Sequence, residues 1–72
     1  SFKERQRIET LVRREIEEIE GFEPDLAQVV DLKFFCGFSM VEIAALKQVS
    51  ERTVQRQWEK ARLLLYRALN PV

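Results

Sequence analysis

The apolar residues of this chain recur mainly at spacings of three and four positions, which is the pattern of amphipathic α-helices. The first predicted helix runs from about Phe2 to Glu20 and presents a single apolar stripe. This stripe consists of Ile8, Val12, Ile16 and Ile19, with Leu11 beside it. We expect Gly21 to end the helix, since glycine tolerates the left-handed geometry that commonly follows a helix C-terminus.

A second predicted helix begins at Pro24, which fits the first helical turn, and runs to about Cys36. Its apolar residues surround most of the circumference: Leu26, Ala27, Val29, Val30, Leu32, Phe34, Phe35 and Cys36. A helix that is apolar nearly all round is buried on several sides. One side therefore faces the following helices, and the other is covered by the first helix or by another protein.

Two further helices are marked by serine caps. Gly37 ends the second helix, and Ser39 with Glu42 forms an S-x-x-E capping box at the start of the third. Ser50 is the expected N-cap of a fourth helix over about residues 51–69. The short distance between the caps predicts a short helix followed by a sharp turn near residues 47–50.

These elements predict an all-α fold, because no alternating strand pattern appears in the sequence. Two capped helices joined by a sharp turn predict a four-helix, helix-turn-helix domain without winged strands. We divide the chain into an N-terminal amphipathic helix, residues 1–21, and a helix-turn-helix DNA-binding domain, residues 22–72.

The charges of the chain balance overall but not locally. Twelve Lys and Arg face twelve Asp and Glu, which gives a net charge of zero. Between Glu15 and Leu32 there are seven acids and no base, whereas from Lys47 onward there are six bases and two acids. This asymmetry indicates a nucleic-acid-binding surface on the C-terminal part of the chain.

The fourth helix separates into two faces at 100° per residue. The core face consists of Val54, Trp58, Ala61, Leu65 and Ala68, and the opposite face of Arg52, Arg56, Lys60 and Arg67, with Thr53 and Gln55 at its flank. Arginine can read guanine and glutamine can read adenine, whereas Lys60 and Arg67, farther along, suit phosphates. The alternative is a solvated helix whose arginines contact nothing.

Composition argues against an enzyme. The chain has no histidine, no cysteine or histidine cluster with metal-ligand spacing and no glycine-rich phosphate loop. We therefore expect no catalytic residue, cofactor, metal or small-molecule substrate. Cys36, the single cysteine, predicts a reducing, cytoplasmic environment without disulfides. No apolar run approaches the ~18 residues of a membrane span and no leader pattern opens the chain, so no membrane partner is expected.

The run from Pro24 to Leu69 resembles region 4, the C-terminal DNA-binding domain of bacterial RNA polymerase sigma factors, and most closely the extracytoplasmic-function group. The matching segments are VVDLKFFCGFS, VEIA, VSERTV and WEKARLLLYRAL. The resemblance implies recognition of the −35 promoter element by the last helix and docking on the flap of the polymerase β subunit. The DNA-facing set that it implies is Ser50, Arg52, Thr53, Gln55, Arg56, Glu59 and Lys60.

The resemblance also gives the apolar second helix a candidate role. Val29, Leu32 and Phe35 share one arc, which either docks on the polymerase flap or is covered by the first helix. The second alternative is favoured because so short a chain needs all the burial available to it.

Two features depart from the sigma-factor pattern. Gln48 stands where the family usually has glycine, and Lys47 stands where leucine is common. Gln48 is therefore expected to adopt a positive φ, or the turn to be shifted by one residue. The sigma domain that recognises the −10 element is not in this sequence, so we expect the chain to be one domain of a longer protein.

Two other functions remain open at this point. A stand-alone regulator of the LuxR-like type also resembles the G-x-S-x-x-E-I-A and S-x-x-T-V segments, and it would bind paired half-sites as a dimer. A protein-interaction module is the third, in which the first helix pairs with a partner helix of an anti-sigma protein.

Overall fold

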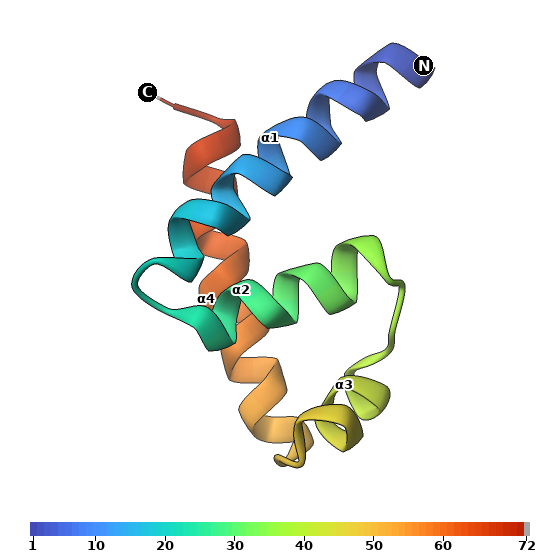
Figure 1. Ribbon diagram of the computed structural model, residues 1–72, viewed down its shortest axis with the longest axis vertical. Helices are drawn as coiled ribbons and strands as arrows, with labels where there is room; N and C mark the ends of the chain where they lie inside the picture. The colour runs from blue at the N-terminus through green and yellow to red at the C-terminus, as the bar shows by residue number, and fades with distance from the viewer. Residues whose placement is uncertain (72) are drawn as a thin grey trace.

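The computed structural model describes residues 1–71 and consists of helices joined by short turns (Figure 1). The helices are α1 (Phe2–Glu20), α2 (Pro24–Val30), α3 (Met40–Lys47) and α4 (Glu51–Leu69), and the π-helical segment η1 (Asp31–Phe35) continues α2 directly. No strand occurs within residues 1–71, and the predicted all-α, helix-turn-helix fold is confirmed. Val72, the last residue of the range assigned to the DNA-binding domain, lies outside the described residues.

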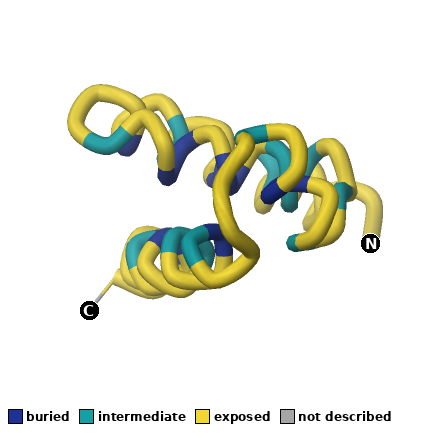
Figure 2. The backbone as a smooth tube through the Cα atoms, turned by 90° about the horizontal axis from the view of Figure 1, so that it is seen from below, coloured by how far each residue is buried: buried dark blue, intermediate teal, exposed yellow. Residues whose placement is uncertain are grey.

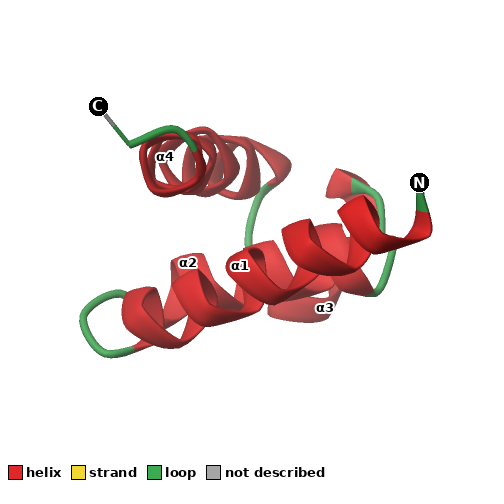
Figure 3. Ribbon diagram, turned by 90° about the horizontal axis from the view of Figure 1, so that it is seen from above, coloured by secondary structure: helices red, strands yellow, loops and turns green. Residues whose placement is uncertain are grey.

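The helices form two layers, with α4 on one side and α1, α2 and α3 on the other (Figure 3). The buried residues lie where these helices face one another (Figure 2). They form three clusters: Val12, Val30, Ala61 and Leu65; Val29, Ile43, Ala44 and Val54; and Ile19, Leu26 and Ala27. Trp58 of α4 packs against the first two clusters, so one side chain ties the helix-turn-helix to α1 and α2.

Only the C-terminal half of α1 uses its apolar stripe for packing. Val12 and Ile19 are buried, whereas Ile8 is 46% exposed. The first turns of α1 extend beyond the other helices (Figure 1). Gly21 does end the helix, but its predicted left-handed geometry is wrong, since φ is −66°. Right-handed geometry suffices here because the next two amides, those of Phe22 and Glu23, both donate to the Ile19 carbonyl.

The π-helical segment η1 shifts the faces of the second predicted helix. The Cys36 amide donates to the Asp31 carbonyl at 3.1 Å, a bond that closes one wide turn. A wide turn rotates each residue by less than 100°, so Phe35 leaves the arc of Val29 and packs with Val30 against α1. The predicted grouping of Phe35 with Val29 is therefore wrong.

Glycine and serine set the connection between η1 and α3, as the sequence predicts. Gly37 has a left-handed φ of +73°. The capping box is complete: Ser39 Oγ accepts from the Glu42 amide at 3.1 Å, and Glu42 Oε1 accepts from the Ser39 amide at 2.9 Å. The hydrogen bond from the Ser39 amide lowers the pKa of the Glu42 carboxyl below its ordinary value.

The turn between α3 and α4 places Gln48 in the left-handed region, at φ 59° and ψ 43°. The expectation of a positive φ at Gln48 is thus confirmed. Its amide donates to the Ala45 carbonyl, and the following amide, of Val49, donates to the Ala44 carbonyl at 3.0 Å. Ser50 then caps α4 by accepting a hydrogen bond from the Thr53 amide at 3.1 Å.

The predicted core face of α4 is confirmed over most of its length. Val54 and Ala61 are fully buried, and Leu65 nearly so. Ala68 is exposed, contrary to the prediction, and Leu69 packs against the first cluster in its place. The longer leucine side chain at the next position reaches this cluster, whereas the methyl group of Ala68 stays exposed.

We predict that Gln48→Gly raises the melting temperature and that Gln48→Val lowers it. A β-branched side chain is strained at positive φ, whereas glycine is not. The gain for glycine is limited to a few °C because glycine also makes the unfolded chain more flexible. Thermal unfolding followed by circular dichroism measures both changes. A valine variant as stable as the parent would contradict the left-handed turn.

We predict that Glu42→Gln destabilises the domain at pH 7 and that the difference from the parent narrows as the pH falls below about 4.5. The sign follows from the lowered pKa of Glu42: its stabilisation is present above the ordinary pKa and is lost as the pH falls through the folded one. Melting temperatures between about pH 7 and pH 3 provide the measurement.

Glu15→Gln is the matched control for the Glu42 variant. Desolvation by burial raises the pKa of the Glu15 carboxyl, and the neighbouring Glu18 raises it further. Its charged form is therefore unfavourable in the folded state, and this variant should be at least as stable as the parent at pH 7. Equal pH dependence in the two variants would contradict the assignment of the cap.

Candidate nucleic-acid interface

The first half of α4 carries an exposed polar face opposite its buried one. Five of the predicted DNA-facing residues on this helix are exposed and one, Thr53, is half-buried; the exposed ones are Arg52, Gln55, Arg56, Glu59 and Lys60. On the opposite side, Val54 and Ala61 have no exposed surface. The structure therefore brings the predicted residues together on one side of a helix whose other side is fixed in the core.

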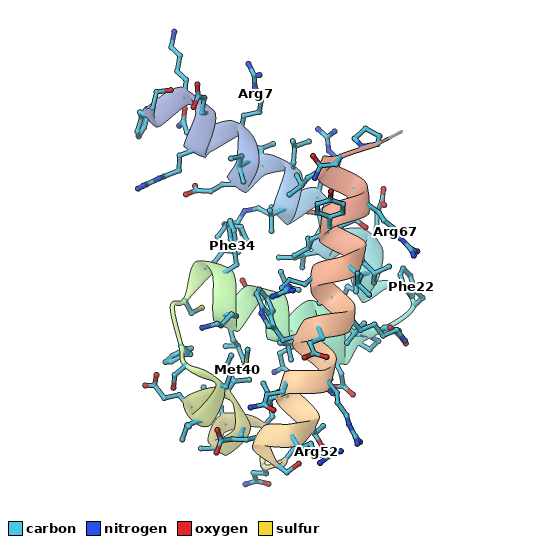
Figure 4. All side chains as sticks on the ribbon, turned by 180° about the vertical axis from the view of Figure 1, so that it is seen from behind. Arg7, Phe22, Phe34, Met40, Arg52 and Arg67 are labelled. Carbon is cyan, nitrogen blue, oxygen red and sulfur yellow. The ribbon has the colours of Figure 1, made fainter. Side chains whose placement is uncertain are left out.

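The core fixes the direction of this face. Val54 packs with Val29 of α2 and with Ile43 of α3, and Trp58 reaches the same cluster one turn later. Arg52 lies in the first turn of α4, next to the α3–α4 turn, and Arg67 lies toward the opposite end of the helix (Figure 4). The basic side chain that begins the helix thus stands at the far end of the molecule from the projecting turns of α1.

The hydroxyl groups at the start of α4 are engaged with each other. Ser50 Oγ accepts from the Thr53 amide and donates to Thr53 Oγ1 at 3.0 Å. The hydroxyl proton of Thr53 remains able to donate to an anion such as a phosphate oxygen. Ser50, although predicted in the DNA-facing set, has its side chain committed to the cap, so its direct contribution is to hold the first turn of α4.

The two arginines of this face are available for a ligand. Neither Arg52 nor Arg56 forms an ion pair with another described residue, and both are exposed. Guanidinium groups donate in a planar fork that matches the O6 and N7 atoms of guanine and the oxygens of phosphate. Gln55 supplies an amide beside them, and Glu59 adds an acceptor for the amino group of cytosine or adenine. The face can therefore read base edges as well as bind phosphates.

Lys60 differs from the other bases because it has an ion-pair partner. Its ammonium lies 2.6 Å from Glu23 Oε1, at the start of α2. Lys47, at the end of α3, donates to the Asp25 carbonyl at 3.1 Å and lies 3.8 Å from the Asp25 carboxylate. No role for Glu23, Asp25 or Lys47 in these contacts was predicted from the sequence. The acidic stretch that contains Glu23 and Asp25, and the unusual lysine at position 47, were the available signals.

The three predicted docking residues do not share one surface. Val29 has no exposed surface and belongs to the helix-turn-helix core. Leu32 is half-buried at the edge of the same cluster, whereas Phe35 packs toward α1, with the Arg13 guanidinium 4.1 Å above its ring. Coverage by the first helix, the favoured alternative, therefore applies to Phe35 but not to Val29, which α3 and α4 bury instead. Phe34, not included in that set, is 41% exposed.

Two other kinds of feature, a metal site and a membrane-spanning helix, are not found in the described residues. Within residues 1–71, no group of three or more cysteine, aspartate or glutamate side chains is placed to hold a metal ion. No helix in this part of the chain is both long enough and apolar enough to cross a membrane.

Comparison with known proteins agrees with this geometry. The family model described as ECF sigma factor matches residues 2–71, nearly the whole chain. No curated protein and no solved structure gives a significant match. The match covers α1 as well as the helix-turn-helix, so the first helix is part of the family pattern. The chain therefore belongs to the family of ECF sigma factors, DNA-binding proteins that act with RNA polymerase in the initiation of transcription.

Proposed function

We propose that this chain recognises the −35 element of promoters through α4 and docks on the flap of the RNA polymerase β subunit. The exposed polar face of α4 supports the proposed recognition of the −35 element. On this face, Arg52 and Arg56 have no ion-pair partner among the described residues. A helix held from behind by Val54 and Trp58 presents that face as a rigid unit, as a recognition helix requires.

In this proposal the N-terminal turns of α4 enter the major groove. Arg52, Gln55 and Arg56 reach base edges, while the Thr53 hydroxyl donates to the phosphate backbone. Glu59 either accepts from a base amino group or orients Arg56, which lies one turn before it. The left-handed residue Gln48 sets the direction in which α4 leaves α3, so it determines which of these side chains meets the groove first.

The proposed docking surface lies on the opposite side of α2 from α1. Leu32 remains partly exposed there, beside the partly exposed Phe38 and Met40 that pack on the same cluster. Val29 supports this surface from within and does not contact a partner itself. Phe35, which packs toward α1, lies outside this surface.

The proposed partners place the protein in the cytoplasm, where promoter DNA and RNA polymerase meet.

An anti-sigma protein is a further proposed partner. The first half of α1 leaves Ile8 and the neighbouring Leu11 exposed, which gives a partner helix the end of the apolar stripe to cover. The family match favours these roles over a stand-alone LuxR-like regulator, for which the structure offers no specific observation.

We predict that Arg56→Ala weakens binding to promoter DNA by at least about fivefold, as expected for loss of one base contact. The melting temperature should change little because Arg56 is exposed. Fluorescence anisotropy with a labelled duplex, selected from a random pool by the parent chain, gives the affinity. Arg7→Ala is the matched control, since Arg7 points away from the α4 face on α1 (Figure 4). Equal losses for the two variants would remove Arg56 from the recognition surface.

We predict that the chain binds the isolated flap domain of the β subunit in a saturable one-to-one complex, measurable by calorimetric titration. Leu32→Gln should weaken this complex about tenfold or more while the domain stays folded, because Leu32 lies at the edge of its cluster. Phe35→Asp should instead lower the melting temperature, since the ring packs in the core. A folded dimer that ignores the flap and prefers palindromic DNA would contradict the proposal and indicate a LuxR-like regulator.

A further inference from the structure

The start of α2 holds one lysine from each helix of the helix-turn-helix. Glu23 pairs with Lys60 of α4, with 2.6 Å between Oε1 and Nζ. Asp25, two residues later, holds Lys47 of α3 through its carbonyl at 3.1 Å and its carboxylate at 3.8 Å. The segment Glu23-Pro24-Asp25 thus binds two of the six basic side chains that follow position 46.

The two contacts differ in how firmly they are held. The Lys47 side chain is only 6% exposed, so its ammonium is enclosed by the protein. The Lys60 side chain is 59% exposed and that of Glu23 is 34% exposed. An exposed ion pair of this kind is weak and exchanges with other partners. The contact between Lys47 and Asp25 is therefore part of the folded structure. The ammonium of Lys60, in contrast, could leave Glu23 and bind a phosphate instead.

The exchangeable pair lies at the border of the DNA-facing surface. Lys60 follows Arg56 by one helical turn on α4. A groove runs between this part of α4 and the α1–α2 turn, and its lining includes Arg56, Lys60 and Phe22. Phe22 stands beside the middle of α4 (Figure 4), which places the turn that leads into Glu23 next to the recognition helix.

The Glu23 side chain has no role in starting α2. Its backbone carbonyl accepts from the amides of Leu26 and Ala27, at 3.1 and 3.2 Å, but its carboxylate forms no cap hydrogen bond. The second carboxylate oxygen, Oε2, is buried without a hydrogen-bond donor among the described residues. A buried oxygen without a hydrogen bond lowers the free energy of unfolding. Replacing Glu23 by glutamine, which is uncharged and has nearly the same shape, should therefore change stability little.

We propose that Glu23 is a positioning residue that holds Lys60 away from the DNA backbone and so limits the affinity of this domain for DNA of any sequence. This inference rests on the proposed function of α4. Each lysine that neutralises a phosphate releases counterions and steepens the dependence of binding on salt. Lys60 paired with Glu23 makes no such contribution, and discrimination is left to Arg52, Gln55 and Arg56. A carboxylate beside the groove thereby favours specific over non-specific binding.

A double-mutant cycle on this chain tests the proposal, with a short mixed-sequence DNA duplex as the probe. Affinity is measured by fluorescence anisotropy over a series of salt concentrations for the parent, Glu23→Gln, Lys60→Gln and the double variant. Glu23→Gln should bind about two- to fivefold more tightly, the range expected for release from an exposed pair. The slope of log affinity against log salt should steepen by about 0.9, the value for one added phosphate contact.

The Lys60 variants separate this mechanism from simple repulsion between Glu23 and DNA. Lys60→Gln alone should change affinity by less than about twofold, and in the Glu23→Gln background it should abolish both the gain and the steeper slope. A gain that persists without Lys60 would overturn the proposal, since it would show direct repulsion. A loss for Lys60→Gln as large as that for Arg56→Ala would also overturn it, because Lys60 would then already contact DNA in the parent.

Melting temperatures and the Arg56→Ala variant distinguish an error in the role of Glu23 from an error in the proposed function of α4. Melting temperatures establish that each variant is folded, and Glu23→Gln should stay within about 5 °C of the parent. If Arg56→Ala weakens binding but Glu23→Gln changes nothing, the role of Glu23 is wrong and that of α4 stands. If Arg56→Ala binds as well as the parent, or if no variant binds DNA even at low salt, both are wrong.

Discussion

The packing of Val54 and Trp58 against α2 and α3 is the interaction on which the rest of the structure depends. Val54 has no exposed surface and lies between Val29 and Ile43, so the first turn of α4 cannot rotate without opening this cluster. Trp58 extends the same contact to the cluster shared with α1. Because the exposed arginines lie on the other side of the same turns, core packing sets the direction of the DNA-facing surface.

The second helix is the structural centre of the domain. Its buried residues face α1 and α4 on one side and α3 with α4 on the other, so most of the core passes through it. The π-helical segment η1 allows Phe35 to turn toward α1, while Leu32 stays with the helix-turn-helix. The same helix begins with the acids that hold Lys47 and Lys60. Fold stability and the charge of the DNA-facing surface are therefore linked through one element.

Local signals predicted most of the fold. The capping box at Ser39, the cap at Ser50 and the end of the second helix at Gly37 depend on residues close together in the sequence, and the structure contains each of them. The expectation for Gly21 failed because the amides that follow it satisfy the helix end without a left-handed residue. The arc that joined Phe35 to Val29 failed because a pattern of 100° per residue cannot anticipate a wide turn.

Only the part of the candidate site that depends on local signals was predicted from the sequence. Helical periodicity placed Arg52, Gln55 and Arg56 on one face, and the structure agrees. The Glu23–Lys60 pair joins residues 37 positions apart, and the Asp25–Lys47 contact joins residues 22 apart. Such contacts depend on how the helices pack. The uneven charge distribution along the sequence indicated separate acidic and basic regions, but it could not predict which acid pairs with which base.

A nuclear magnetic resonance titration of the isotope-labelled chain with a promoter duplex tests whether α4 is the DNA-recognition helix, because it reports on the backbone amides of all helices at once. We expect the chemical-shift changes to concentrate at residues 50–60, with little change over residues 2–10 in the projecting turns of α1. Changes centred on α1, or spread evenly over the chain, would contradict the assignment of α4 as the DNA-recognition helix.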